Sequence, residues 1–277
     1  MLPVVICVAG MPRSGTSLVT QLLHRCGVHL GAPEQLMPAS INNTDGFWEN
    51  LRFVAVNERL LAASSGSWFS PPATLRPSPD ITAAAQSVIA EFKGQEPWAW
   101  KDPRNALTLP FWKSLLPSMK VLMCVRHPAE TASSLAASTL FPRTFFWEVT
   151  RRDSSIRLHE RLWGVIRTST SIRKRRKVIE EVGLELWRIY NTSILAETRE
   201  EDRIVVHYDA MLTNPRAELD RICDFFGIRV SDDAVQIVSP RLRHQHAGPA
   251  ILDADLAAIY AELSRESTIS TRGVRSG

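Results

Sequence analysis

The amino-acid sequence predicts an α/β fold in which helices flank a parallel central sheet. Two observations lead to this expectation. Short apolar runs, most of them rich in β-branched residues, recur along the chain, and stretches with the apolar spacing of amphipathic helices separate them. The first apolar run also leads directly into a glycine-containing loop that opens a helix. Strands that alternate with helices in this way form parallel sheets with right-handed crossovers.

Each predicted strand is short and apolar: Val4–Ala9, Trp98–Trp100, Lys120–Val125 and Ile204–His207. Apolar residues at helical spacing predict helices at Ser17–Arg25, Phe53–Leu61, Ile81–Phe92, Ala129–Ala137, Leu184–Ala196, Pro215–Phe226 and Asp253–Leu263. The prolines of Ser70–Pro79 predict an irregular loop. The tail from Ser264 to Gly277 has little to bury, so we expect it to order only with a ligand.

Length and composition favour one domain over residues 1–277, because 277 residues with 44% hydrophobic content can bury one large core. The net charge is only +4, yet Arg151–Lys177 holds ten Lys or Arg against Asp153 and Glu160. We expect a basic helical insertion or lid at about 143–180. Its charge could attract an anionic ligand or could form an ordinary solvated surface. Nucleic acid is not an expected partner, because no aromatic residues interleave with this charge in a binding motif.

The cysteines and the apolar runs bear on localisation and metal content. Cys7, Cys26, Cys124 and Cys223 are scattered, which predicts buried, reduced thiols and a cytoplasmic protein. The run Val4–Ala9 is too short to span a membrane, so no stable membrane insertion is expected. No His, Cys or carboxylate cluster has metal-ligand spacing, so no metal is expected.

The most informative segment is the loop after the first strand, Gly10-Met11-Pro12-Arg13-Ser14-Gly15-Thr16-Ser17. Free backbone N–H groups and the positive end of the following helix can bind a phosphate there, and glycines allow its close approach. The spacing of Gly10 and Gly15 matches a nucleotide-binding P-loop, but Thr16 occupies the position of the required lysine. The only cation in the loop is Arg13, which disfavours a kinase that handles a magnesium-bound triphosphate.

This loop resembles the 5′-phosphosulfate loop of the sulfotransferase family, in members that carry Arg where the cytosolic steroid and phenol enzymes carry Lys. The resemblance implies a P-loop-like three-layer sandwich and a co-substrate, 3′-phosphoadenosine 5′-phosphosulfate (PAPS). It implies that Pro12, Arg13, Ser14, Gly15, Thr16 and Ser17 bind that co-substrate, and it extends from Val4 to about Phe226.

A second anion-binding element follows the strand Lys120–Val125. Arg126 lies directly after the strand, and Ser134 follows eight residues later on a helix. An arginine and a helix hydroxyl can hold a second phosphate together. In sulfotransferases, an Arg and a Ser at this separation bind the 3′-phosphate of the co-substrate, and Arg126 and Ser134 fall on those positions.

Two further segments resemble the family. Trp100-Lys101-Asp102-Pro103-Arg104 lies at the end of a predicted strand, where α/β sheets bind ligands. The resemblance implies that Lys101 stabilises charge on the sulfuryl oxygens or the leaving phosphate; Asp102 and Arg104 are either an ion pair or substrate contacts. Tyr208, in a segment similar to the family's Tyr-Glu-Asp-Leu, is either an adenosine contact or a buried, hydrogen-bonded tyrosine.

Sulfuryl transfer also needs a base to accept the acceptor's proton, while Arg13 and Lys101 neutralise the leaving group. The histidine that cytosolic sulfotransferases use is absent after the second strand. Glu34 lies twenty-one residues after Arg13, where several carbohydrate and tyrosylprotein sulfotransferases place their catalytic glutamate. Glu49 lies in an aromatic segment and is either the base or part of a helix cap. Of the two, Glu34 is the favoured candidate.

The predicted function is therefore PAPS-dependent sulfuryl transfer to a hydroxyl or amine of a carbohydrate or other small molecule. The alternatives are a nucleotide-dependent kinase and a non-catalytic nucleotide-binding protein. The acceptor itself is not encoded in any motif. Aromatic residues that either line its pocket or belong to the core are Trp48, Trp68, Phe69, Trp98, Trp112 and Trp147.

Overall fold

A parallel sheet forms the centre of the computed structural model, which describes residues 4–39, 46–138, 172–239 and 252–269. In this part of the chain the sheet has four strands in the order β2-β1-β3-β4. Their bounds are β1 Val5–Ala9, β2 Trp98–Lys101, β3 Lys120–Val125 and β4 Arg203–His207. All four predicted strands are confirmed, with ends shifted by at most one residue. Cys7 of β1 is paired with Trp100 on one side and Val121 on the other.

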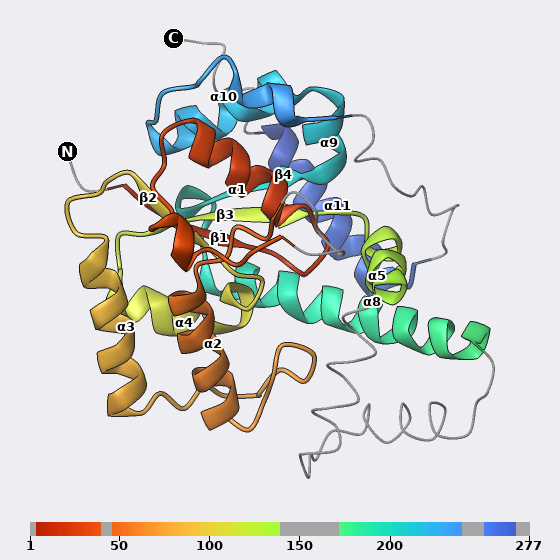
Figure 1. Cartoon of the computed structure of the whole chain (residues 1–277). Helices are drawn as coiled ribbons and strands as arrows, with labels where there is room; N and C mark the ends of the chain where they lie inside the picture. The colour runs from red at the N-terminus through yellow and green to blue at the C-terminus, as the bar shows by residue number, and fades with distance from the viewer. Residues whose placement is uncertain (1–3, 40–45, 139–171, 240–251, 270–277) are drawn as a thin grey trace.

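Helices cover both faces of the sheet, as Figure 1 shows. On one face lie α1 and α10, and on the other lie α2, α3, α4 and α8. The helix bounds are α1 Thr16–Arg25, α2 Leu51–Ala63, α3 Pro79–Glu91, α4 Asn105–Leu115, α5 Pro128–Ala137, α8 Ile172–Glu197, α9 Tyr208–Thr213, α10 Pro215–Phe226 and α11 Ala254–Ile269. Short 3-10 helices are η1 Pro33–Gln35, η2 Glu200–Asp202 and η3 Ala234–Ile237.

Each strand is buried on both faces, because alternate side chains enter the two helical layers. On β1, Ile6 and Val8 pack toward α1 and α10, whereas Val5, Cys7 and Ala9 pack toward the opposite layer. Two hydrophobic cores therefore lie on the two sides of one sheet. This arrangement confirms the predicted α/β class.

Several local predictions need correction. The sequence analysis missed α4, whose interior contains Pro110, a residue that ordinarily disrupts a helix, and it missed the short α9. Helix α8 begins at Ile172, twelve residues before the predicted Leu184. The tail prediction was wrong up to Ile269: these residues continue α11, and Glu266 pairs with Arg203 at 2.7 Å. The predicted insertion at about 143–180 lies outside the described residues up to 171, and residues 172–180 belong to α8.

Close helix packing fixes α5 against α8. A Cβ atom on Gly183 of α8 would lie 2.9 Å from the Cα atom of Ala132 on α5, so only glycine allows this approach. Arg176 Nη2 also donates to Ser133 Oγ at 3.0 Å. Helix α8 therefore holds in place the helix that carries Ser134.

Two general properties follow from the described residues. None of the described helices is long and apolar enough to cross a membrane. The four cysteines are free thiols, and only Cys26 is partly exposed. Burial raises the pKa of Cys124 to about 12, although the charge of Lys101 opposes the shift.

Candidate active site

The loop between β1 and α1 is built around residues with positive φ. Gly10 has φ 151°, Gly15 has φ 95°, and Arg13 adopts φ 75°, a conformation that costs free energy outside glycine. A Cβ atom on Gly10 would lie 2.6 Å from the carbonyl oxygen of Cys124, and one on Gly15 would overlap the ring of Tyr208. Both glycines are therefore required by close contacts.

This loop fits an anion. The N-terminus of α1 has no side-chain cap, so its backbone N–H groups and its dipole point toward the loop. Ser14 is 2% exposed, and its hydroxyl has no hydrogen-bond partner among the described residues. A buried hydroxyl without a partner is costly, and a bound phosphate or sulfate oxygen would supply one.

The second predicted anion element lies directly beside the loop. Arg13 Nε donates to Ser134 Oγ at 3.1 Å, which joins residues 121 positions apart. Arg126, at the end of β3, forms a 3.0 Å ion pair with Glu130 one turn into α5. Burial, and then the charge of Arg126, lower the pKa of Arg13. Two guanidinium groups close enough to repel each other are stabilised by an anion between them.

Tyr208 closes this group of residues from the end of β4. Its ring lies under the Arg126 guanidinium, 4.7 Å from ring centroid to Cζ, which is a cation–π contact. Burial raises the pKa of Tyr208, while the charges of Arg126 and Arg13 oppose the shift. The structure thus brings together the loop, Arg126, Ser134 and Tyr208.

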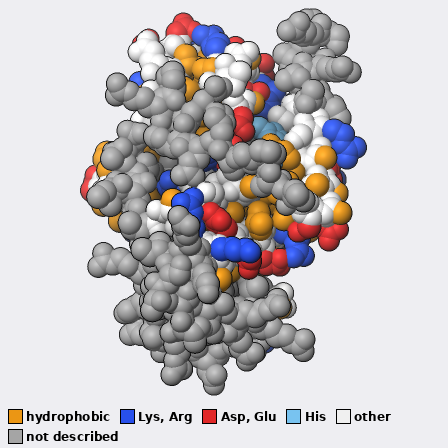
Figure 2. Space-filling model, turned by 90° about the vertical axis from the view of Figure 1, so that its right-hand side faces the viewer, with side chains coloured by type: hydrophobic (Ala, Val, Ile, Leu, Met, Phe, Trp, Pro, Cys, Tyr) orange, Lys and Arg blue, Asp and Glu red, His pale blue; other side chains and the backbone are white. Residues whose placement is uncertain are grey.

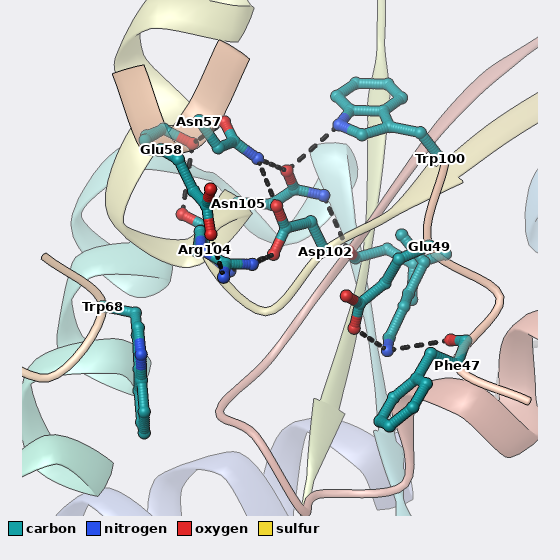
Figure 3. A network of polar contacts seen from close by, with 12 residues as sticks. Phe47, Glu49, Asn57, Glu58, Trp68, Trp100, Asp102, Arg104 and Asn105 are labelled. Atoms are coloured by element: carbon teal, nitrogen blue, oxygen red, sulfur yellow. Dashed lines mark hydrogen bonds and ion pairs between the residues drawn. The ribbon is translucent and has the colours of Figure 1, made fainter. Parts of the chain in front are cut away.

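Lys101 and Glu49 form a buried ion pair near the same end of the sheet. Lys101 Nζ lies 2.6 Å from Glu49 Oε1, and the two side chains are 2% and 8% exposed. Lys101 also donates to the carbonyl oxygen of Phe47 at 3.0 Å (Figure 3). A third bond runs from Lys101 Nζ to Ser17 Oγ at 3.3 Å. Because Ser17 lies on α1, Lys101 links the phosphate loop to the segment that carries Glu49.

Asp102 and Arg104, which the sequence predicted to be either an ion pair or substrate contacts, form an ion pair. Asp102 is fully buried, and its Oδ1 accepts from Arg104 Nη1 at 3.0 Å (Figure 3). Arg104 also pairs with Glu58 on α2 at 2.8 Å. Although burial disfavours its charge, Asp102, Glu58 and Glu49 raise the pKa of Arg104.

Glu34 is placed differently from Glu49. It lies exposed on η1, and its carboxylate makes no hydrogen bond or ion pair to a described residue. Its neighbour Gln35 faces Asn50, the residue after Glu49, with 3.4 Å between Oε1 and Nδ2. The structure therefore joins Glu49 to Lys101 and leaves Glu34 outside this contact.

Three features of the site were missed by sequence reasoning. Glu130 follows Arg126 by four positions on a helix, and this spacing is a signal that could have identified the pair. Phe47 contributes only its carbonyl oxygen, which no sequence pattern reveals. Asn57 is fully buried next to Asp102 and reads in sequence as an ordinary polar helix residue.

The aromatic candidates for an acceptor pocket divide into two groups. Phe69, Trp98 and Trp112 are buried in the core, whereas Trp48 and Trp68 are partly exposed. Trp147 lies outside the described residues. Tyr190 Oη donates to the carbonyl oxygen of Trp68 at 2.7 Å, which ties this loop to α8. Figure 3 shows the indole of Trp68 on the same side of the network as Arg104 and Glu58.

The site lies on the face toward which β3 points. Figure 1 shows that β3 ends toward α5, and Figure 2 views the molecule from that side. In the described part of this face, Lys, Arg, Asp and Glu side chains lie next to a group of hydrophobic side chains. Ligands of open α/β sheets bind at this carboxyl edge. Within the described ranges, no group of three His, Cys, Asp or Glu residues could hold a metal ion.

Comparisons with known proteins agree with this geometry. Residues 3–232 match the model of the sulfotransferase family. The comparison with curated proteins found no match. Two solved structures share the fold. The sulfotransferase domain from the curacin biosynthetic pathway has a TM-score of 0.54 and 16% identity over 95% of this chain and 98% of that domain. The sulfotransferase domain from the Synechococcus PCC 7002 olefin synthase has a TM-score of 0.53 and 17% identity over 94% of each chain.

The family match covers most of the chain and confirms the resemblance that the phosphate loop indicated. The two solved domains confirm the P-loop-like fold. The chain belongs to the sulfotransferase family and is a sulfotransferase.

Proposed function

We propose that this enzyme transfers a sulfuryl group from PAPS to a hydroxyl or amine of a carbohydrate or other small molecule. The observation that carries the proposal is the meeting of two anion-binding elements with a buried Lys101–Glu49 pair. Two anion-binding elements side by side suit a donor with two anionic groups, a 5′-phosphosulfate and a 3′-phosphate.

Two sets of residues hold the donor in this proposal. Arg13, the hydroxyl of Ser14 and the amides at the start of α1 bind its 5′ end, and Arg126 and Ser134 bind its 3′-phosphate. The buried, unpartnered Ser14 hydroxyl and the proximity of the two guanidinium groups support this assignment. Tyr208, which lies against Gly15 and under Arg126, contacts the adenosine.

PAPS supplies a sulfuryl group whose bond to the 5′-phosphate oxygen breaks as the bond to the acceptor forms. Negative charge then gathers on the departing phosphate. Lys101 and Arg13 neutralise that charge, and the burial of Lys101 strengthens its interaction relative to water. Lys101 is held for this role by the three acceptors around its ammonium group.

We propose Glu49 as the general base, with Glu34 as the alternative. Oε1 of Glu49 binds Lys101, and Oε2 makes no hydrogen bond to a described residue, so this oxygen is available for the acceptor's proton. The same lysine that stabilises the leaving group thereby orients the base. Glu34 has no such contact, although its distance along the chain from Arg13 matches that of the glutamate in related enzymes.

The partly exposed Trp68 and the Arg104–Glu58 pair form one side of the acceptor region in this proposal. An indole face suits a sugar or an aromatic ring, and the neutralised arginine does not demand an anionic acceptor. A labelled-PAPS transfer screen over sugars, phenols and glycolipids would identify the acceptor.

Calorimetric titration with 3′,5′-adenosine diphosphate and with ATP tests the donor site. We expect 3′,5′-adenosine diphosphate to bind more tightly. Tighter binding of ATP would favour a kinase, and binding without any transfer in the screen would favour a non-catalytic nucleotide-binding protein.

A further inference from the structure

Asn57, on the inner face of α2, is the centre of a buried hydrogen-bond network (Figure 3). It is fully buried, and its Nδ2 donates to Asp102 Oδ2 at 2.9 Å and to Asn105 Oδ1 at 3.0 Å. Its Oδ1 accepts from Thr108 Oγ1 and from Trp112 Nε1, both at 2.8 Å. One side chain therefore connects α2 with the end of β2 and with α4.

The partners of Asn57 fix the end of β2, where Lys101 lies. Asp102 directly follows Lys101, and its second oxygen accepts from the backbone N–H of Arg104 at 2.9 Å. Asn105 Nδ2 donates to the carbonyl oxygen of Val8 on β1 at 3.0 Å, and Oδ1 of the same side chain accepts from Trp100 Nε1. The turn after Lys101 is thus tied to β1 and to α2 at once.

The other partner of the ion pair, Glu49, depends on the placement of α2. Glu49 precedes Asn50, the N-cap of this helix, whose Oδ1 accepts from Arg52 N at 3.0 Å. Below the cap, Phe53 stacks on Trp100 with ring centroids 5.1 Å apart. The hydrogen bonds of Asn57 fix α2 against the end of β2 and against α4 more sharply than this stack does, because hydrogen bonds have preferred lengths and angles.

We propose that Asn57 is a positioning residue: it holds α2 and the end of β2 in register, so that Glu49 and Lys101 stay within hydrogen-bond distance. The role in catalysis rests on the proposed function of that pair. An apolar side chain of similar size would fill the same space, but it would remove the directional link and leave Asp102 Oδ2 without this donor. Fully satisfied polar networks of this kind specify one arrangement of a core.

Exchanging donor and acceptor tests the proposal. In Asn57→Asp an oxygen replaces the donor that faces Asp102, and the two carboxylates repel each other. In Asp102→Asn one donor faces another. The double variant Asn57→Asp/Asp102→Asn restores a donor–acceptor pair, although Asn105 Oδ1 still lacks its bond from residue 57.

We expect each single variant to lower kcat by about 10- to 100-fold, since small displacements of catalytic groups have effects of this size. The affinity for 3′,5′-adenosine diphosphate should stay close to that of the wild type, because the donor site lies on other elements. The double variant should recover part of kcat. A matched control is Ser64→Ala on the same helix, where the buried Oγ bonds Leu60 O and Arg76 N. It should lower the melting temperature without lowering kcat.

Crystal structures of the variants provide a readout that does not depend on activity. We expect the distance from Lys101 Nζ to Glu49 Oε1 to lengthen beyond hydrogen-bond range in Asn57→Asp and to shorten again in the double variant. An unchanged distance, or a double variant whose kcat equals the product of the two single effects, would overturn the positioning role. If the wild type transferred no sulfuryl group, the proposed function would fail. The distance from Lys101 Nζ to Glu49 Oε1 in the variants would still show whether Asn57 positions this pair. Should Asn57→Asp not fold, Thr108→Val removes one bond to Asn57 and takes its place.

Discussion

Replacing Glu49 with glutamine tests whether Glu49 or Glu34 is the general base, and it exchanges only one carboxylate oxygen for an amide nitrogen. Glutamine keeps the shape of the side chain and an oxygen that faces Lys101, but it cannot accept the acceptor's proton at neutral pH. If Glu49 is the base, kcat should fall by about 10²–10⁴-fold, the usual share of general base catalysis. The affinity for 3′,5′-adenosine diphosphate should stay close to that of the wild type, because no contact joins Glu49 to Arg13, Ser14, Arg126 or Ser134 and its only link to the 5′-phosphate is through Lys101.

The same substitution should lower stability, because it leaves Lys101 buried beside a neutral partner. Breaking a buried ion pair costs about 3–5 kcal/mol, and we expect the lower end because Phe47 O and Ser17 Oγ still accept from Lys101. With an unfolding entropy of about 2.1 cal/mol/K per residue, a loss of about 3 kcal/mol in a chain of 277 residues lowers Tm by about 5 °C. Differential scanning calorimetry measures this change.

Glu34→Gln is the matched control. Its carboxylate is exposed and makes no hydrogen bond or ion pair to a described residue, so we expect a change in Tm near zero and a kcat close to that of the wild type. Steady-state transfer assays with PAPS and the best acceptor from the screen give kcat for both variants. A large loss of kcat confined to Glu34→Gln would move the base to Glu34, and near-normal rates in both would mean that neither carboxylate is the base.

Four other predictions concern the donor site, the fold and metal dependence. Arg13→Ala and Arg126→Ala should each weaken binding of 3′,5′-adenosine diphosphate by about 10- to 150-fold in calorimetric titrations, because each removes a charge-assisted contact of about 1.5–3 kcal/mol. Unchanged affinity in both variants would contradict the two phosphate sites. The affinity of the wild type should also fall with added salt, because salt screens the attraction between the cations and the phosphates. Gly15→Ala should weaken the same binding, because the new Cβ overlaps the Tyr208 ring at φ 95°, and a wild-type affinity would show that the loop tolerates a side chain there. Burial lowers the pKa of His207 below 6.5, so as the pH falls the unfolded state takes up a proton on this residue before the folded state does. The contribution of neutral His207 to stability is therefore present above pH 6.5 and is lost as the pH falls through the folded pKa. Tm should drop more steeply in the wild type than in His207→Asn between about pH 7.5 and about pH 5.5, and equal slopes would contradict this. Transfer activity should survive excess EDTA, because the proposed charge stabilisers are side chains and amides, and a loss that magnesium restores would support a kinase-like mechanism.

The parts of this protein that local sequence determines were predictable. Each strand is a short apolar run, so its position follows from hydrophobicity alone, and the loop from Gly10 to Gly15 is contiguous in the chain. The prediction of helices was wrong where other residues interrupt the apolar spacing of the helix. Pro110 masks α4, and the basic run before residue 178 masks the first turns of α8.

The remaining features depend on tertiary contacts. The Lys101–Glu49 pair joins residues 52 positions apart on different elements, and neither residue carries a signal for the other. The sequence analysis favoured Glu34 from its distance to Arg13, and no local pattern could show that Glu49 faces the lysine. The role of Asn57 is equally non-local, because its four partners come from two other segments.

The glycine contact between α5 and α8 has a consequence for how this enzyme can change over evolution. Gly183 allows the backbones of α5 and α8 to approach each other closely, so the position of α5 depends on its contact with α8. A side chain at position 183 would push the two helices apart and shift Ser134 relative to Arg13. A position that contacts none of the proposed ligand-binding residues therefore constrains the donor site, and glycine should persist at 183 wherever Ser134 keeps its role.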